Sequence, residues 1–78
     1  MLDIKVLGSG CSNCKRTARL IEDTAQAGGV TIHLSKVEDL QEIMRYGVMA
    51  TPAVVIDGRV IHAGGIPDRG AVESWLRA

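Results

Sequence analysis

The chain has 78 residues, enough for one domain with a small core. Nine basic residues balance nine acidic ones, and one Trp and one Tyr are the only large aromatic side chains, which gives no support for binding nucleic acid or anionic lipid. No segment approaches the roughly 20 apolar residues of a membrane span, and the first residues resemble a strand, not a leader peptide. We therefore expect one domain over residues 1–78, cytoplasmic, with no membrane or nucleic-acid partner.

The first half of the chain has a strand, a helix and a second strand. A short apolar, β-branched run predicts a strand at residues 4–7. Residues 12–27 have helical spacing, and one stripe holds Cys14, Thr17, Ala18, Ile21, Thr24 and Ala25. Gly28-Gly29 ends this helix, because glycine adopts the left-handed conformation without strain. Residues 30–37 alternate between apolar and polar side chains, which is typical of a half-exposed edge strand.

A short second helix is predicted where Asp39 is followed by Glu42 in a capping pattern. Its buried face is expected to hold Leu40, Ile43 and Met44. Met49 is also expected in the core, because methionine fills irregular gaps. Proline cannot donate to a sheet ladder, so Pro52 should open the next strand, at residues 53–56.

The last third of the chain predicts a hairpin and a helix. Asp57-Gly58 favours a type I′ turn, which needs positive φ at both central residues. Residues 59–63 are then the antiparallel partner of residues 53–56, and Gly64-Gly65 ends this strand. A final helix begins near residues 66–68. Its buried side chains are expected to be Val72, Trp75 and Leu76.

The only two cysteines, Cys11 and Cys14, lie at the junction of the first strand and first helix, in the run Gly8-Ser9-Gly10-Cys11-Ser12-Asn13-Cys14. A helix N-terminus stabilises an anion through its unpaired N–H groups and its dipole. A thiolate at Cys11 would gain from this position, and Cys14 would lie one turn away, within disulfide reach. The pattern indicates a redox site, with a metal site or an inert pair as alternatives.

With Thr51-Pro52, Asp57-Gly58 and the later Gly64, this CxxC makes the whole chain resemble the small thioredoxin- and glutaredoxin-like redox-active disulfide proteins of bacteria and archaea. The resemblance implies an α/β, minimal thioredoxin-like fold of order β-α-β-α-β-β-α, in which three helices flank a four-stranded mixed sheet. It also implies a cis Thr51–Pro52 bond facing the cysteines, with Cys11 as nucleophile and Cys14 as resolving thiol. The expected substrate contacts are Gly10, Ser12, Asn13, Thr51, Pro52 and Gly64.

The chain departs from ordinary thioredoxins at three points. Gly10 stands where they have Trp before the first cysteine, and Ser12-Asn13 replaces their Gly-Pro. Most also have a buried acid on the first central strand, near the position of Lys5 in this chain. The redox potential and the partner reductase therefore do not transfer from thioredoxin, and the region around Gly64 does not by itself predict glutathione dependence.

The sequence predicts a thiol–disulfide oxidoreductase. Cys11 would attack a partner disulfide, and Cys14 would resolve the mixed disulfide to leave a Cys11–Cys14 bond. No organic cofactor and no metal is needed; the partners are a disulfide-containing protein and a reductase or small thiol. The alternatives are a CxxC metal-binding or metal-transfer module and a docking subunit of a redox complex. Small heavy-metal-associated domains have the order βαββαβ, which ends on a strand, unlike the order predicted here.

Overall fold

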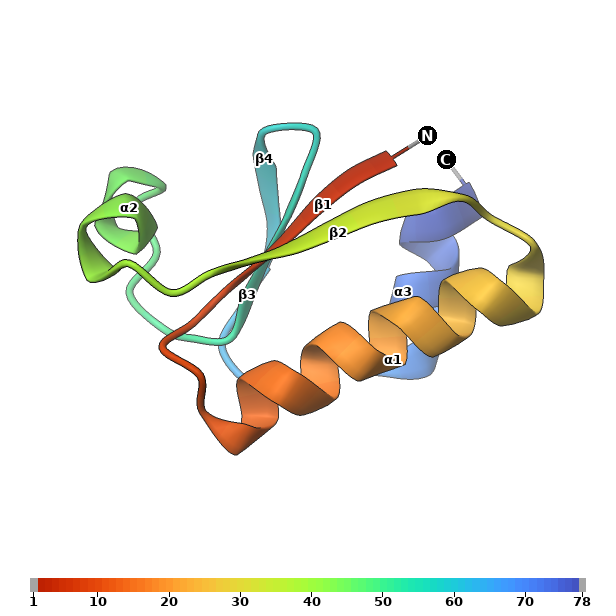
Figure 1. Cartoon of the computed structure of the whole chain (residues 1–78), viewed down its shortest axis with the longest axis horizontal. Helices are drawn as coiled ribbons and strands as arrows, with labels where there is room; N and C mark the ends of the chain where they lie inside the picture. Colours follow the sequence, from red (N-terminus) through yellow and green to blue (C-terminus); the bar gives the residue numbers. More distant parts are fainter. Residues whose placement is uncertain (1, 78) are drawn as a thin grey trace.

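A computed structural model describes residues 2–77. Its elements follow the predicted order: β1 (Leu2–Leu7), α1 (Ser12–Gly28), β2 (Ile32–Val37), α2 (Leu40–Arg45), β3 (Ala53–Ile56), β4 (Arg59–Ala63) and α3 (Arg69–Arg77) (Figure 1). The strands form one sheet in the order β2-β1-β3-β4. β1 pairs with β2 in parallel and with β3 antiparallel, and β3 pairs antiparallel with β4. The four-stranded mixed sheet and three helices confirm the predicted fold.

The larger part of the core lies between the sheet and the two helices α1 and α3. The buried face of α1 is the stripe predicted from its spacing, from Cys14 to Ala25. Thr17 and Thr24 are buried in this stripe, and their hydroxyls donate to the carbonyls one turn earlier, at 2.8 and 2.6 Å. Because both hydroxyls are satisfied, the stripe packs like an apolar one. Its core partners are Ile4, Val6, Val54, Val72 and Leu76.

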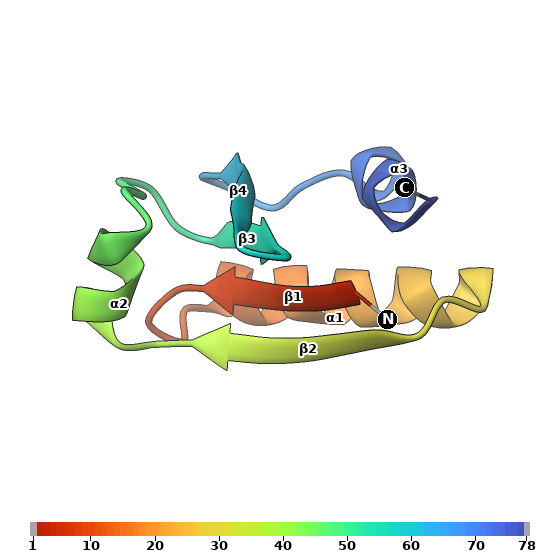
Figure 2. The same cartoon turned by 90° about the horizontal axis from the view of Figure 1, so that it is seen from above.

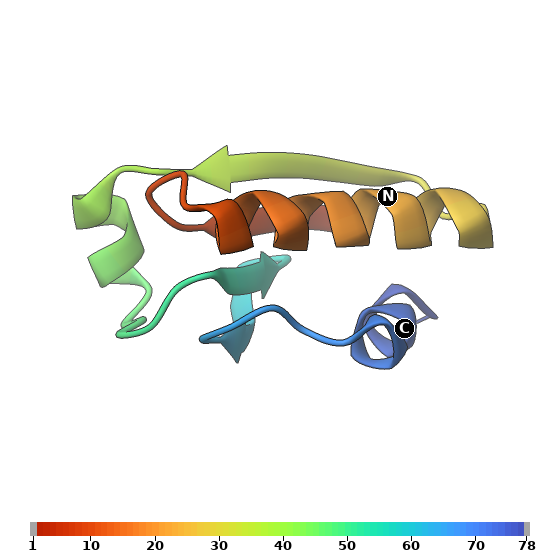
Figure 3. The same cartoon turned by 90° about the horizontal axis from the view of Figure 1, so that it is seen from below.

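The second part of the core lies on the opposite face of the sheet, under α2. Ile43 packs there with Leu7, Ala53 and Val55. Side chains alternate along a strand, so Val54 faces α1 and α3 while its two neighbours face α2. This explains why the sequence of β3 is apolar without alternation. The views from above and from below show α1 running along the sheet, whereas α2 lies at the end where α1 begins (Figures 2 and 3).

Three side chains expected in the core are exposed instead. Leu40 and Met44 are 67% and 65% exposed, and Met49 is fully exposed at 100%. The helix α2 has only six residues, and Ile43 is the one that it buries. Met49 lies in the irregular segment between α2 and β3, where no sheet position holds its side chain inward. The prediction that these three side chains are buried, which relied on their apolar character alone, is therefore wrong.

Element ends differ from the predictions by one to three residues, for local reasons. Gly29 takes the left-handed conformation with φ 67°, so α1 extends to Gly28. The Val30 N–H donates to the Ala25 carbonyl at 2.9 Å, which makes Val30 part of the helix cap and delays β2 to Ile32. In the last helix, the Asp68 carboxylate accepts from the Ala71 N–H at 2.7 Å and caps the N-terminus, so that α3 begins at Arg69.

The predicted hairpin turn is present between β3 and β4. Asp57 and Gly58 both have positive φ, 50° and 86°, as a type I′ turn requires. The pairing of β3 with β4 is irregular between Val54 and Val55.

Among residues 2–77, no helix combines the length and apolarity needed to cross a bilayer.

Replacing Ile21 with alanine should lower the free energy of unfolding by about 2–5 kcal/mol, because it removes a side chain that is 1% exposed from the main core. A small domain has little stability to lose, so much of the variant should be unfolded at 37 °C. The matched control is Leu40→Ala, which truncates an exposed side chain and should change stability by about 0.5 kcal/mol or less. Urea unfolding followed by circular dichroism measures both. Equal losses in the two variants would contradict this division between core and surface.

Candidate active site

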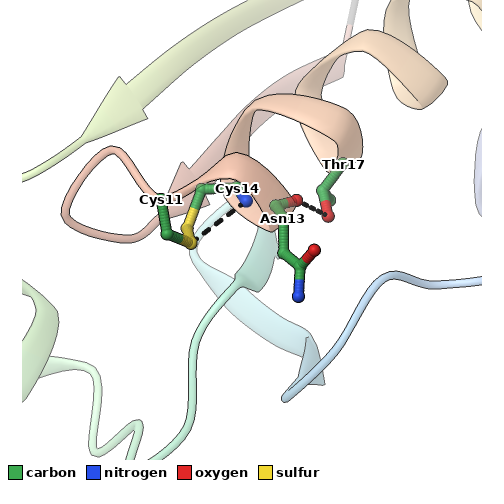
Figure 4. The surroundings of a disulfide bond; sticks show 4 residues. All are labelled: Cys11, Asn13, Cys14 and Thr17. Carbon is green, nitrogen blue, oxygen red and sulfur yellow. Dashed lines mark hydrogen bonds between the residues drawn. A yellow bond between two sulfur atoms is a disulfide. The ribbon is translucent and has the colours of Figure 1, made fainter.

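Cys11 and Cys14 are joined by a disulfide at the start of α1, with their Cα atoms 5.1 Å apart (Figure 4). Cys11 is the N-cap of the helix and has extended backbone. Its Sγ accepts from the Cys14 N–H at 3.2 Å, and its carbonyl accepts from the Lys15 N–H at 3.1 Å. A negative charge on Cys11 Sγ would therefore meet a backbone donor and the positive end of the helix dipole.

The two cysteines differ in their access to solvent. Cys11 is exposed, whereas Cys14 is 6% exposed and belongs to the buried stripe of α1. The Cys11 sulfur is therefore the more accessible of the two to a molecule in solution.

Gly8, at the end of β1, makes room for the buried sulfur. A Cβ added at Gly8 would overlap Cys14 Sγ and would lie 3.8 Å from the Thr51 Cβ. The missing side chain thus lets Cys14 pack against the end of the strand and brings Thr51 close to the cysteines. The Thr51–Pro52 bond is cis, as the resemblance implied, with Thr51 exposed and Pro52 buried.

Gly64 lies beside Pro52. Its N–H donates to the Pro52 carbonyl at 2.9 Å, and its φ is +85°. A Cβ at Gly64 would lie 3.3 Å from the Ala50 Cβ, so a side chain there would be both strained and crowded. His62 approaches the same turn, with Nε2 3.0 Å from the Gly65 carbonyl. The turn after β4 is thus attached to the segment that carries Pro52.

Ser12 and Asn13 occupy the first turn of α1 and are exposed. The Asn13 carbonyl accepts from the Thr17 hydroxyl, and the Asn13 side chain extends away from the helix (Figure 4). Both residues follow the exposed Cys11 directly in the sequence.

A small cavity of about 80 Å³ lies beside Cys14. Its walls are Val6, Gly8, Gly10, Cys14, Lys15, Lys36 and Glu38. Gly10 has φ +80°, and a Cβ there would lie 3.0 Å from Glu38 Oε2. Glycine is therefore favoured at position 10 by its backbone angle and by the carboxylate beside it. The sequence pattern does not indicate Lys36 or Glu38, because only the parallel pairing of Leu7 with Val37 brings them near the cysteines.

Lys5 does not line this cavity. Its Nζ lies 3.4 Å from the Tyr46 hydroxyl, on the face of the sheet that α2 covers. Val6, the next residue, faces α1 and the cavity. The position where many thioredoxins have an acid is thus occupied by a lysine that contacts the second helix.

Two observations bear on the metal alternative. Across residues 2–77, no group of three or more His, Cys, Asp and Glu side chains is arranged to hold a metal ion. The described elements also follow the order β-α-β-α-β-β-α, which differs from the βαββαβ order of heavy-metal-associated domains.

Known proteins resemble the chain over nearly its whole length. It is 28% identical to a thioredoxin of Methanocaldococcus jannaschii, over all of this chain and 90% of that protein. It is 22% identical to a thioredoxin of Methanothermobacter thermautotrophicus, over 97% of this chain and 99% of the relative.

Solved structures share the fold. The oxidised mitochondrial thioredoxin 3 of Saccharomyces cerevisiae matches with a TM-score of 0.68 and 20% identity, over 97% of this chain and 76% of the other. A thioredoxin of Malassezia sympodialis matches with a TM-score of 0.66 and 21% identity, over 97% and 74% of the two chains.

The family model described as "Thioredoxin domain" matches residues 2–77. The match includes the CxxC disulfide, the cis-proline segment and the closing helix. In a protein with this fold and these relatives, the disulfide supports thiol–disulfide exchange as the function of the site. The chain belongs to the thioredoxin domain family.

Proposed function

We propose that the chain is a thiol–disulfide oxidoreductase in which Cys11 is the nucleophile and Cys14 the resolving thiol. In the reduced protein, Cys11 thiolate attacks a sulfur of a partner disulfide. A Cys11–partner bond forms, the partner disulfide breaks, and its other sulfur leaves as a thiolate. Cys14 thiolate then attacks Cys11 Sγ, which forms the Cys11–Cys14 disulfide and releases the second partner sulfur. Two electrons pass from the cysteine pair to the partner, and the reverse sequence oxidises a partner dithiol.

The observation that supports this assignment is the division of the pair into an exposed and a buried sulfur. Cys11 is exposed at the N-cap of α1, where a thiolate is stabilised and accessible. Cys14 is 6% exposed and already lies within bonding distance of Cys11. The reverse assignment would require a partner to enter the packed side of the helix.

The segment before β3 is proposed to hold the partner. Thr51 is exposed beside Gly8 and the disulfide, whereas the Pro52 carbonyl already accepts from Gly64. An extended peptide could therefore pair with the backbone of Thr51, in the way that peptides add to a strand. Ser12, Asn13 and Gly64 would border this peptide on its other sides. Gly10 would contribute through its backbone, because its positive φ allows the tight turn that precedes Cys11.

The physiological partners are proposed by chemical class. A protein disulfide is the oxidised partner, and a reductase or small thiol supplies the electrons that regenerate the dithiol. We propose that residues 1–78 act as one domain and that the protein works in the cytoplasm, where such a pair would be kept reduced.

Alkylation of the reduced protein near neutral pH should label Cys11 well before Cys14, because only Cys11 is both exposed and at the helix N-terminus. Iodoacetamide labelling at timed intervals, followed by peptide mapping, measures the two rates. Labelling after denaturation is the control, since it should remove most of the difference. Faster labelling of Cys14 in the folded protein would reverse the assignment.

The single-cysteine variants should fail at different steps. Cys14→Ser should accumulate the mixed disulfide with a partner, because attack by Cys11 is retained and resolution is lost. Cys11→Ser should form no mixed disulfide at a useful rate, because Cys14 is buried. Non-reducing electrophoresis with an insulin substrate distinguishes them. Equal trapping by both variants would show that the cysteines are interchangeable.

Gly8→Ala should destabilise the oxidised protein by about 1–3 kcal/mol, because the new methyl group overlaps Cys14 Sγ and either the sulfur or β1 must shift. The matched control is Gly28→Ala, where the added Cβ would make an ordinary 3.7 Å contact with Val30. Gly28 is helical, so alanine there should leave stability unchanged or raise it. Urea unfolding of the oxidised variants tests the pair, and an unaffected Gly8→Ala protein would show that the site has more room than the structure indicates.

A further inference from the structure

The buried position of Cys14 creates a requirement for proton transfer. In the mixed disulfide, Cys14 is a thiol and must lose its proton before it can attack Cys11 Sγ. Bulk water has little direct access, because the residue is 6% exposed. The proton must therefore leave through the space beside the sulfur, which is the cavity of about 80 Å³ that Cys14 shares with the ends of β1 and β2. A cavity of this size has room for water.

The side chains that line this cavity offer one proton acceptor. Val6, Gly8 and Gly10 provide no titratable group. Lys15 and Lys36 provide ammonium groups, which have no lone pair to accept a proton at neutral pH. The Glu38 carboxylate can accept one. Among residues 2–77 the ion pairs join Arg19 to Asp23 and Arg69 to Glu73, and neither of them occupies Glu38.

The Glu38 carboxylate lies beside the turn before Cys11. Its Oε2 is 3.0 Å from the place where a Cβ of residue 10 would be. Glu38 lines the cavity together with Gly10 and Cys14. Glu38 is also exposed on its outer side, so that it can pass a proton on to solvent.

We propose that Glu38 accepts the proton of Cys14 through water in this cavity during resolution of the mixed disulfide. The inference rests on the proposed function and assigns a further residue to it. The Cys14 S–H bond breaks and its proton reaches the Glu38 carboxylate. The Cys14 thiolate then attacks Cys11 Sγ, the Cys11–Cys14 bond forms, and the bond from Cys11 to the partner breaks. The partner sulfur leaves with the electron pair, and Glu38 returns its proton to solvent.

The charges around Cys14 show how a purely electrostatic role of Glu38 would change the rate of resolution. Lys15 and Lys36 favour a thiolate at Cys14, and the negative charge of Glu38 opposes it. If Glu38 acted only through its charge, its replacement by glutamine would ease thiolate formation and speed resolution. If it accepts the proton, the same replacement slows resolution. The two roles therefore predict changes in opposite directions.

The test is a two-step reaction of the reduced protein with dithiobis(nitrobenzoate), a small aromatic disulfide that releases a coloured thiolate at each step. Attack by Cys11 gives the first release, and resolution by Cys14 gives the second. In Glu38→Gln the second step should be at least about tenfold slower near pH 7, while the first stays within about twofold of wild type. The deficit should shrink as pH rises, because hydroxide can then take the proton directly.

Two further variants separate proton transfer from other effects. Glu42→Gln removes the same charge from a neighbouring residue that does not line the cavity, and should leave both steps unchanged. Glu38→Asp keeps a carboxylate and should recover part of the second-step rate near neutral pH. Circular dichroism confirms that each variant is folded.

Each result has a distinct meaning. A second step that is unchanged or faster in Glu38→Gln, or equally slow at every pH, would overturn the role of Glu38 and leave the proposed function intact. Absence of the first step in the wild-type protein would instead contradict the proposed function itself.

Discussion

The packing of Cys14 against Gly8 is the contact on which the site depends. It fixes the start of α1 against the end of β1, because the sulfur occupies the volume that a side chain at residue 8 would fill. Cys14 is held inward, whereas Cys11, three residues earlier, is the N-cap of the helix and has its sulfur at the surface beside the Cys14 N–H. Thr51 lies on the same side of Gly8, 3.8 Å from the place where a Cβ of that residue would be. One small residue thus sets the different environments of two chemically identical thiols.

The sheet then gathers the rest of the site from distant parts of the sequence. Antiparallel pairing of β1 with β3 brings the cis-proline segment to the end of β1. Parallel pairing of β1 with β2 brings Lys36 and Glu38 to the same end from the other side. The disulfide is therefore flanked by an exposed segment, which we propose binds the partner, and by the small cavity, which we propose receives the Cys14 proton.

Much of this arrangement can be predicted from local sequence, and the remainder depends on pairing between strands. The spacing of the apolar residues predicts the buried stripe of α1, because a helix long enough to cross the sheet must bury one continuous face. Asp57-Gly58 predicts the hairpin for a similar local reason. The short helix α2 shows where such reasoning ends, since its Leu40 and Met44 have helical spacing but no surface to cover. No local sequence pattern predicts that Glu38 lies beside Gly10, because only the parallel register of β1 and β2 brings the two residues together.

The unequal depth of the two core layers has a consequence for how stability is distributed. The layer under α1 and α3 has eight buried residues from four elements, whereas the layer under α2 has four, Leu7, Ile43, Ala53 and Val55. Segments with few buried apolar contacts open at lower free energy than the rest of a domain. We therefore expect the end of the molecule that contains α2 and the approach to β3 to open at lower free energy than α1, whose buried face belongs to the deeper layer. The two sides of the disulfide would then differ in local stability, with the cysteine-bearing helix on the more stable side.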